Sequence, residues 1–175
     1  LRTLAAIALL IHYRRDYTEL ARAPGFRQGM IAVFSGLLVF ALWILPYPAW
    51  LGGHAEHMPL REGMDIFWLV CRWSGSALVV PIIEELFWRS YLMRRLEHSE
   101  FMSVSPASVS TYAVAVSSVL FAIEHQLWFA GLLAGLVYAW LYRRFQLLWV
   151  PVLAHMITNA VLGAWVVFGG HWQYW

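Results

Sequence analysis

The stretch PIIEELFWRS, residues 81–90, places two adjacent glutamates and an arginine inside an apolar run that extends over residues 65–93. Charged side chains in the hydrocarbon core of a bilayer cost about 2.5–3.5 kcal/mol each on insertion scales, so they are rare there and usually functional. Glu85 and Arg89 are four residues apart and share a helix face, where they can form a hydrogen-bonded ion pair. Glu84 is rotated by about 100° from Glu85 and can therefore point at a different neighbour.

The composition is that of an integral membrane protein. The 175 residues are 61% hydrophobic and 13% charged, with a mean hydropathy of +0.61, whereas about a quarter of the residues in a soluble domain are charged. The net charge of +2 comes from arginines between apolar segments, which indicates membrane topology and not a nucleic-acid-binding surface. The single cysteine, Cys71, excludes an internal disulfide. The sequence starts at Leu1 without a methionine, so we expect a truncated N-terminus.

Six apolar segments predict an all-α fold, namely a polytopic bundle of transmembrane helices that forms a single domain over residues 1–175. The segments are residues 1–13, 28–46, 65–93, 107–129, 130–142 and 147–169. The segment 130–142 rises only about 20 Å, less than the roughly 30 Å hydrocarbon core. We therefore expect residues 107–142 to form a short helical hairpin that turns inside the membrane. Gly131 and Gly135 would let this hairpin pack closely.

The arginines between the segments predict the orientation of the chain. The loops hold Arg14, Arg15, Arg22, Arg27, Arg94, Arg95, Arg143 and Arg144. If these loops are cytoplasmic, the positive-inside rule is satisfied, as expected for a multi-pass protein of a bacterial inner membrane. The loop 47–64 then lies outside, and we expect its His54 and His57 to be solvated and not metal ligands. Arg72 and Glu124 lie toward the outer leaflet, where we predict a structural ion pair between them.

Two further polar motifs occur in the apolar segments. Phe121 and His125 are four residues apart and share a helix face, as do His155 and Asn159. Each histidine alone could equally be a hydrogen-bonded structural residue. Two glutamates, two histidines and an asparagine on three membrane helices together indicate a functional site near the middle of the membrane.

This set of residues is suited to the hydrolysis of an amide. A glutamate beside a histidine in a dry cavity can activate water as a general base. Arg89 would hold Glu85 ionised, which leaves Glu84 as that base. An asparagine or histidine donor directed at a carbonyl oxygen would stabilise the developing oxyanion. Peptide bonds could thus be cleaved without a serine or cysteine nucleophile.

The three motifs resemble those of the CPBP family, the CAAX-protease and bacteriocin-processing intramembrane endopeptidases. The family pattern is EExxxR, then FxxxH, then HxxxN. The chain matches it at Glu84, Glu85, Arg89, Phe121, His125, His155 and Asn159. The resemblance covers residues 66–168, with Ser90 in the position where the family usually has glycine. Within the family, the chain looks most like CAAX-protease-related proteins that accompany bacterial exosortase systems.

The resemblance implies an intramembrane endopeptidase that acts on a membrane-associated peptide or protein. It implies that Glu84 and His125 activate water. It also implies that His155 and Asn159 stabilise the tetrahedral intermediate, while the second glutamate and the arginine of the first motif organise the site. The bacterial type of composition argues against prenylated CAAX proteins as the substrate.

Other cofactors and functions stay open. The older family name is metalloprotease, and a zinc ion would be held by Glu84, His125 and His155. No HExxH spacing is present, so we favour a metal-free mechanism without a cofactor. A non-catalytic bacteriocin-immunity or scaffold protein is one alternative, against which the intact motifs argue. A proton-coupled transporter with a Glu–His relay is another, although paired halves are not visible in the sequence.

Overall fold

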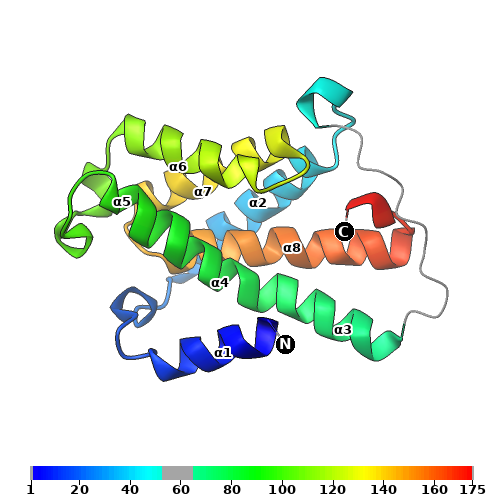
Figure 1. Cartoon of the computed structure of the whole chain (residues 1–175), viewed down its shortest axis with the longest axis horizontal. Helices are drawn as coiled ribbons and strands as arrows, with labels where there is room; N and C mark the ends of the chain where they lie inside the picture. The colour runs from blue at the N-terminus through cyan, green and yellow to red at the C-terminus, as the bar shows by residue number, and fades with distance from the viewer. Residues whose placement is uncertain (1, 53–64, 175) are drawn as a thin grey trace.

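The computed structural model describes residues 2–52 and 65–174, and this part of the chain is built from helices without a strand (Figure 1). The separate helices are α1 Arg2–His12, α2 Phe26–Trp43, α6 Thr111–Ile123, α7 Trp128–Phe145 and α8 Trp149–Gly169. One continuous helix comprises α3 Ile66–Ser74, a π-helical stretch Gly75–Val79, α4 Val80–Glu85, a second π-helical stretch Leu86–Leu92, and α5 Met93–Arg95. Short 3₁₀ turns lie at Thr18–Leu20, Ala49–Leu51, Phe101–Ser103, Pro106–Ser108 and Trp172–Tyr174. His54 and His57, with most of the loop 47–64, lie outside the described residues.

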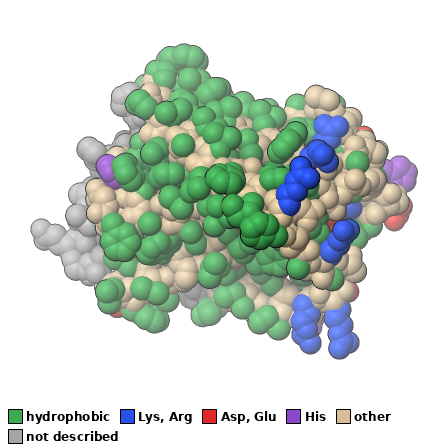
Figure 2. Space-filling view, turned by 180° about the vertical axis from the view of Figure 1, so that it is seen from behind, with side chains coloured by type: hydrophobic (Ala, Val, Ile, Leu, Met, Phe, Trp, Pro, Cys, Tyr) green, Lys and Arg blue, Asp and Glu red, His purple; other side chains and the backbone are tan. Residues whose placement is uncertain are grey.

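The predicted all-α membrane bundle is confirmed. Among the described residues, three helices are long and apolar enough to cross a membrane: Phe26–Trp43, Ile66–Arg95 and Trp149–Gly169. The helix α6 has 13 residues, which gives it a length of about 20 Å and makes it too short to cross. It forms the expected short hairpin with α7. Apolar side chains cover much of the outer surface (Figure 2), as lipid contact requires.

Glycines allow the closest helix contacts in the bundle. A Cβ on Gly36 of α2 would lie 2.4 Å from the carbonyl oxygen of Ala154 in α8. A Cβ on Gly135 of α7 would lie 3.1 Å from the Cα of Ser118 in α6, and the nearest α6 atom to such a Cβ on Gly131 is at 3.2 Å. Both glycines of the GLLAG stretch therefore face α6, which confirms that they permit the hairpin to pack closely.

The helix that carries the first motif departs from regular α geometry on both sides of its glutamates. Pro81 has no backbone N–H to donate to the preceding turn, and the π-helical stretch 75–79 lies directly before it. The second π-helical stretch, 86–92, contains Arg89 and Ser90. Such stretches occur frequently at functional sites, because they change the direction of side chains within an otherwise continuous helix.

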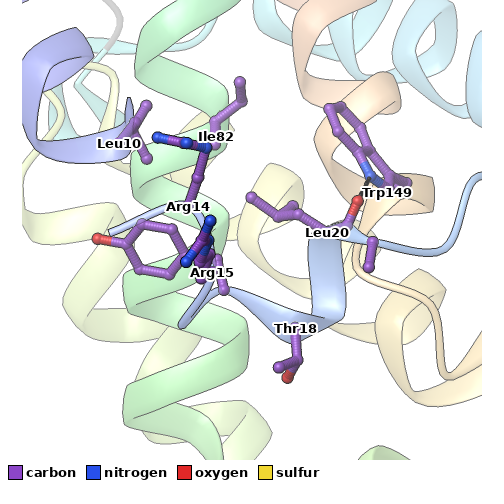
Figure 3. Close-up of a pocket in the computed structure, with 9 residues that line it drawn as sticks. Leu10, Arg14, Arg15, Thr18, Leu20, Ile82 and Trp149 are labelled. Atoms are coloured by element: carbon purple, nitrogen blue, oxygen red, sulfur yellow. Dashed lines mark hydrogen bonds between the residues drawn. The ribbon is translucent and has the colours of Figure 1, made fainter. Parts of the chain in front are cut away.

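Arginines gather at one end of the molecule (Figure 2), where the α1–α2 loop is fixed to the bundle. Glu19 of this loop accepts hydrogen bonds from the hydroxyls of Ser90 and Tyr142. It also forms an ion pair of 2.8 Å with Arg94. The indole N–H of Trp149 donates to the carbonyl of the next loop residue at 2.7 Å (Figure 3). The serine that replaces the usual glycine thus binds a neighbouring loop.

The predicted ion pair between Arg72 and Glu124 is wrong. It is not among the ion pairs that the described residues form. The helix α3 packs on α8, whereas α6 packs on α7, and α3 and α6 lie far apart in Figure 1. The Arg72 guanidinium lies over the ring of Trp68, 5.3 Å from its centre. The prediction considered only the depth expected for the two residues and not their positions around the bundle.

Candidate active site

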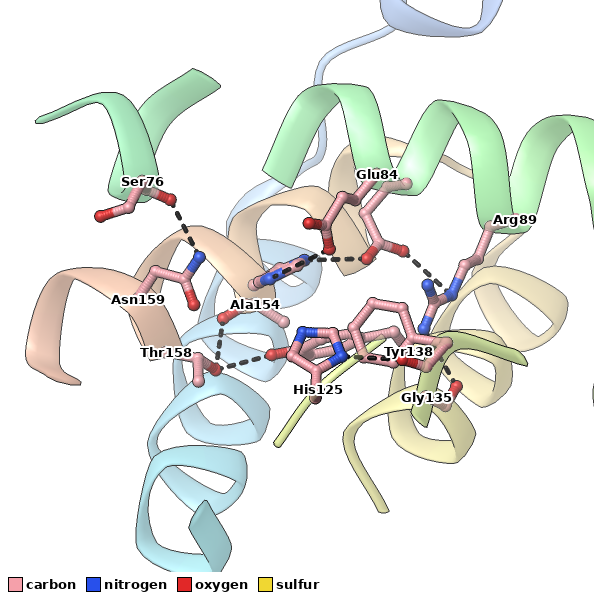
Figure 4. Close-up of polar contacts among 12 residues, drawn as sticks. Ser76, Glu84, Arg89, His125, Gly135, Tyr138, Ala154, Thr158 and Asn159 are labelled. Carbon is pink, nitrogen blue, oxygen red and sulfur yellow. Dashed lines mark hydrogen bonds and ion pairs between the residues drawn. The ribbon is translucent and has the colours of Figure 1, made fainter. Parts of the chain in front are cut away.

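The three motifs meet at a cavity of about 130 Å³ inside the bundle (Figure 4). It is lined by Trp43, Val80, Glu84, Phe121, His125, Ala134, Tyr138, His155, Thr158 and Asn159. A water molecule needs about 10–15 Å³ of such space, so the cavity has room for several. Four of the six predicted site residues line the cavity, and Glu85 and Arg89 lie beside it. The sequence thus predicted which helices converge.

Glu85 and Arg89 form the same-face ion pair that their spacing predicts. Arg89 Nε lies 3.1 Å from Glu85 Oε2, and both side chains are at most 2% exposed. The two atoms lack the geometry of a hydrogen bond, which corrects the expectation of a hydrogen-bonded pair. Arg89 donates instead to the carbonyl of Gly135 at 3.2 Å, and its guanidinium lies 4.7 Å from the centre of the Phe121 ring. The buried cation is therefore compensated by a carboxylate, a carbonyl and an aromatic face.

His155 connects the two glutamates. Its Nδ1 lies 3.0 Å from Glu85 Oε1, and its Nε2 lies 4.0 Å from Glu84 Oε2. An ionised carboxylate only accepts hydrogen bonds, so Nδ1 donates in this contact and Nε2 is the ring nitrogen on the side of Glu84. Tyr138 stacks on the imidazole at 4.9 Å and 21° between planes, which fixes the plane of the ring. The sequence predicted His155 as a site residue but not its contact with Glu85.

Glu84 is the glutamate that faces the cavity. Its side chain is 27% exposed, yet Oε2 is buried and has no hydrogen-bond partner among the described residues. A buried polar atom without a partner costs about 1–3 kcal/mol. The 4.0 Å gap to His155 Nε2 is too long for a direct hydrogen bond but suits a bridging water. The site therefore holds one glutamate that is paired and one that is available.

His125 lies in the turn after α6 and not on the helix itself, because α6 ends at Ile123. Phe121 and His125 therefore do not share a helix face as expected, and a hydrogen bond joins them instead. The Nδ1 of His125 lies 2.7 Å from the carbonyl oxygen of Phe121. A carbonyl only accepts, so Nδ1 of His125 donates in this contact and Nε2 is not used by it. Trp43 of α2 packs edge-to-face on this imidazole, with centroids 5.4 Å apart.

Asn159 is held by the π-helical stretch that precedes the first motif. Its Nδ2 donates to the carbonyl of Ser76 at 2.9 Å, which leaves the second N–H of the amide available. The adjacent Thr158 accepts a hydrogen bond of 2.8 Å from the Tyr138 hydroxyl and donates to the carbonyl of Gly36 at 2.9 Å. Sequence reasoning missed Tyr138 and Thr158. The only signal for Thr158 was its place beside Asn159, one turn after His155.

The alternative zinc site does not fit the residues as they are placed. Structural and catalytic zinc sites need at least three protein ligands. Within residues 2–52 and 65–174, no three His, Cys, Asp or Glu side chains are grouped closely enough to hold a metal ion. In the set Glu84, His125 and His155, both histidines use Nδ1 in a hydrogen bond, which leaves Nε2 of each ring available, so these bonds do not argue against a metal. The metal-free mechanism nevertheless stays a prediction, which an assay with a chelator tests.

Comparison with known proteins bears on the same region. The family model described as Type II CAAX prenyl endopeptidase Rce1-like matches residues 66–161, which include all three motifs. The Bacillus subtilis (strain 168) protein named "Putative membrane peptidase YdiL" is 32% identical over 90 residues, 48% of this chain and 32% of that protein. The matched region thus spans about a third of the length of this curated relative. No solved structure shows a significant match.

Proposed function

Since this chain belongs to the Type II CAAX prenyl endopeptidase Rce1-like family, we propose that it is an intramembrane endopeptidase that hydrolyses a peptide bond of a membrane-associated peptide or protein. The observation that carries the proposal is the buried Oε2 of Glu84, which has no hydrogen-bond partner among the described residues. It faces a cavity with room for water, together with His125, His155 and Asn159. A general base, a second acceptor and two potential donors are thus grouped around space for a substrate carbonyl.

In the proposed reaction, Glu84 takes a proton from a water molecule in the cavity, with Nε2 of His125 as a second acceptor. The water oxygen forms a bond to the carbonyl carbon of the peptide, and the carbonyl oxygen becomes the oxyanion. The free N–H of Asn159 and a protonated Nε2 of His155 would stabilise this oxyanion. The C–N bond then breaks, and the proton on Glu84 passes to the leaving amine.

The buried pair of the first motif would organise the site and not touch the substrate. Glu85 accepts from Nδ1 of His155, which directs Nε2 toward Glu84 and the cavity. Arg89 balances the charge of Glu85 from the far side. The two residues are therefore positioning residues in this proposal.

We also propose that the protein works in the inner membrane of a bacterium. The relative identified above is bacterial, and the arginines at one end of the bundle fit a cytoplasmic surface (Figure 2). The substrate would be a peptide or protein segment held at the bilayer, and nothing in the cavity requires it to be prenylated.

Cleavage by matched variants tests the proposal. The purified full chain in proteoliposomes is incubated with a library of quenched fluorescent peptides, and the products are identified by mass spectrometry. Glu84→Gln and His125→Ala should each lower kcat by about 10²–10⁴-fold, because each removes a proton acceptor. Glu124→Gln is the control, since Glu124 is exposed and does not line the cavity. Undiminished cleavage in either site variant contradicts the assignment, and loss of cleavage in a chelator would return zinc to the mechanism.

A further inference from the structure

A second pocket lies at the end of the bundle where the arginines gather (Figure 3). Its volume is about 510 Å³. It is lined by Leu10, Arg14, Arg15, Tyr17, Thr18, Leu20, Ala21, Ile82 and Trp149. Its walls come from α1, the α1–α2 loop, α4 and the first turn of α8. The pocket shares no lining residue with the candidate active site, so the proposed peptidase reaction does not account for it.

The charged residues of this pocket are both positive. Arg14 and Arg15 are exposed and line it, whereas Asp16 does not. One N–H of Arg14 donates to the carbonyl of Ile11 at 3.0 Å, and Arg15 has no ion-pair partner among the described residues. The nearby carboxylate of Glu19 is already engaged by the bundle. Two guanidinium groups therefore present N–H donors that phosphate oxygens can accept in a bidentate manner.

An apolar groove adjoins this pocket. Its volume is about 320 Å³, and it runs between α1 and the helix of the first motif. It is lined by Ala6, Leu9, Leu10, Tyr17, Ile83, Leu86 and Phe87. Leu10 and Tyr17 belong to both spaces. Ala6 lies one turn before Leu10 on α1, so the apolar lining extends about 6 Å along that helix from a residue that borders both spaces. A ligand that fills both spaces must therefore be charged at one end and apolar at the other.

We propose that the pocket and the groove together form a binding site for an anionic phospholipid. The phosphate would lie between Arg14 and Arg15, and one acyl chain would follow the groove between α1 and α4. Basic residues at the cytoplasmic surface attract anionic lipids. Free phosphate would leave the groove unfilled, and a zwitterionic lipid would bring its own cation to the two arginines. The anionic phospholipid is therefore the occupant that satisfies both the charge and the shape.

The test uses the purified full chain in a neutral detergent, to which phosphatidylglycerol, phosphatidylcholine or inorganic phosphate is added. Binding is measured by the rise in Tm with ligand concentration and by native mass spectrometry of the retained lipid. Phosphatidylglycerol should raise Tm and be retained, and the other two ligands should have little effect. Arg14→Gln/Arg15→Gln should weaken its apparent affinity about tenfold or more. The control Arg22→Gln/Arg27→Gln removes the same charge from the α1–α2 loop and the first turn of α2, and should stay within about threefold at about 0.3 M salt.

Four results would overturn the proposal. Equal protection by phosphatidylcholine would mean that the arginines do not select the lipid, and equal protection by inorganic phosphate would mean a free-anion site. Equal weakening in the two double variants would mean diffuse surface charge. If the glutamine variant does not fold, Arg14→Lys/Arg15→Lys keeps the charge and should retain the preference for phosphatidylglycerol. Ala6→Trp fills the groove and leaves the arginines in place, so undiminished lipid retention in that variant also contradicts the site.

Discussion

Removing the Arg89 guanidinium should destabilise the bundle strongly, because Arg89 is the buried counter-ion of a buried carboxylate. In Arg89→Leu, the fully buried Glu85 keeps His155 as its one polar partner among the described residues. Breaking a buried ion pair by removing one partner costs about 3–5 kcal/mol. The hydrogen bond to the carbonyl of Gly135 is lost as well, while contact of the leucine with Phe121 offsets part of the loss. We therefore expect the free energy of unfolding to fall by about 3–5 kcal/mol.

The double variant Glu85→Gln/Arg89→Leu should recover much of this stability. Replacing both charges of a buried pair with neutral groups is often close to neutral, because no uncompensated charge remains. Glu85→Gln alone should again be destabilising, since it leaves the Arg89 cation buried. The two substitutions should thus be coupled by about 2–3 kcal/mol, far above the roughly 0.5 kcal/mol seen for independent sites.

Equilibrium unfolding of the purified full chain in mixed detergent micelles, followed by circular dichroism, gives the four free energies of this cycle. Arg95→Leu is the control, because Arg95 lies on the same helix but is exposed. It should change the free energy of unfolding by no more than about 0.5 kcal/mol. A coupling energy below about 0.5 kcal/mol between Glu85 and Arg89 would refute the reasoning. Their burial would then be tolerated for some reason other than their mutual charge.

Two further predictions concern stability. Gly36→Ala should lower Tm and reduce the free energy of unfolding by about 1–3 kcal/mol, because the new Cβ would lie 2.4 Å from the Ala154 carbonyl oxygen. The control Gly29→Ala, whose Cβ would meet nothing within 4 Å, should leave Tm unchanged or raise it. A larger loss of Tm in Gly29→Ala than in Gly36→Ala would contradict the close contact of α2 and α8. Hydrogen bonds from Ser110 lower the pKa of Glu97 below 4.5, so its stabilising effect is present above pH 4.5 and is lost as the pH falls through the lowered value. The difference in Tm between wild type and Glu97→Gln should therefore shrink in acid, and a difference independent of pH would show that the carboxylate is not responsible.

The sequence predicted much of the fold because its main constraints are local. Apolar runs of sufficient length predict membrane helices, and residues 107–142 predicted a helical hairpin. Its short helix is α6, however, and not the segment 130–142, which lies within the 18 residues of α7. Spacing along one helix likewise predicted the pair of Glu85 and Arg89. The position of a helix around the bundle depends on contacts between segments that are distant in sequence. The predicted pairing of Arg72 with Glu124 was wrong for this reason.

The contacts of the site could be predicted only in part. The motif residues could be identified because they are polar or charged side chains within apolar segments. Which residue each of them contacts depends on the orientation of α4 relative to α8. The packing of α4 on α8 places His155 between the two glutamates. Tyr138 stacks on the His155 ring from α7, a helix that carries none of the three motifs. Glu19 gave no signal at all, since a glutamate in a loop is usually solvated.

Two contacts with neighbouring elements also limit the rotation of the first-motif helix about its axis. Arg89 donates to the carbonyl of Gly135 in α7, and five residues later Arg94 forms an ion pair with Glu19 of the α1–α2 loop. Rotation of this helix about its axis would break both attachments together, so the direction of Glu84 is determined by interactions in which Glu84 takes no part. Changes in the α1–α2 loop can therefore alter the alignment of the proposed base with the cavity from outside the membrane core.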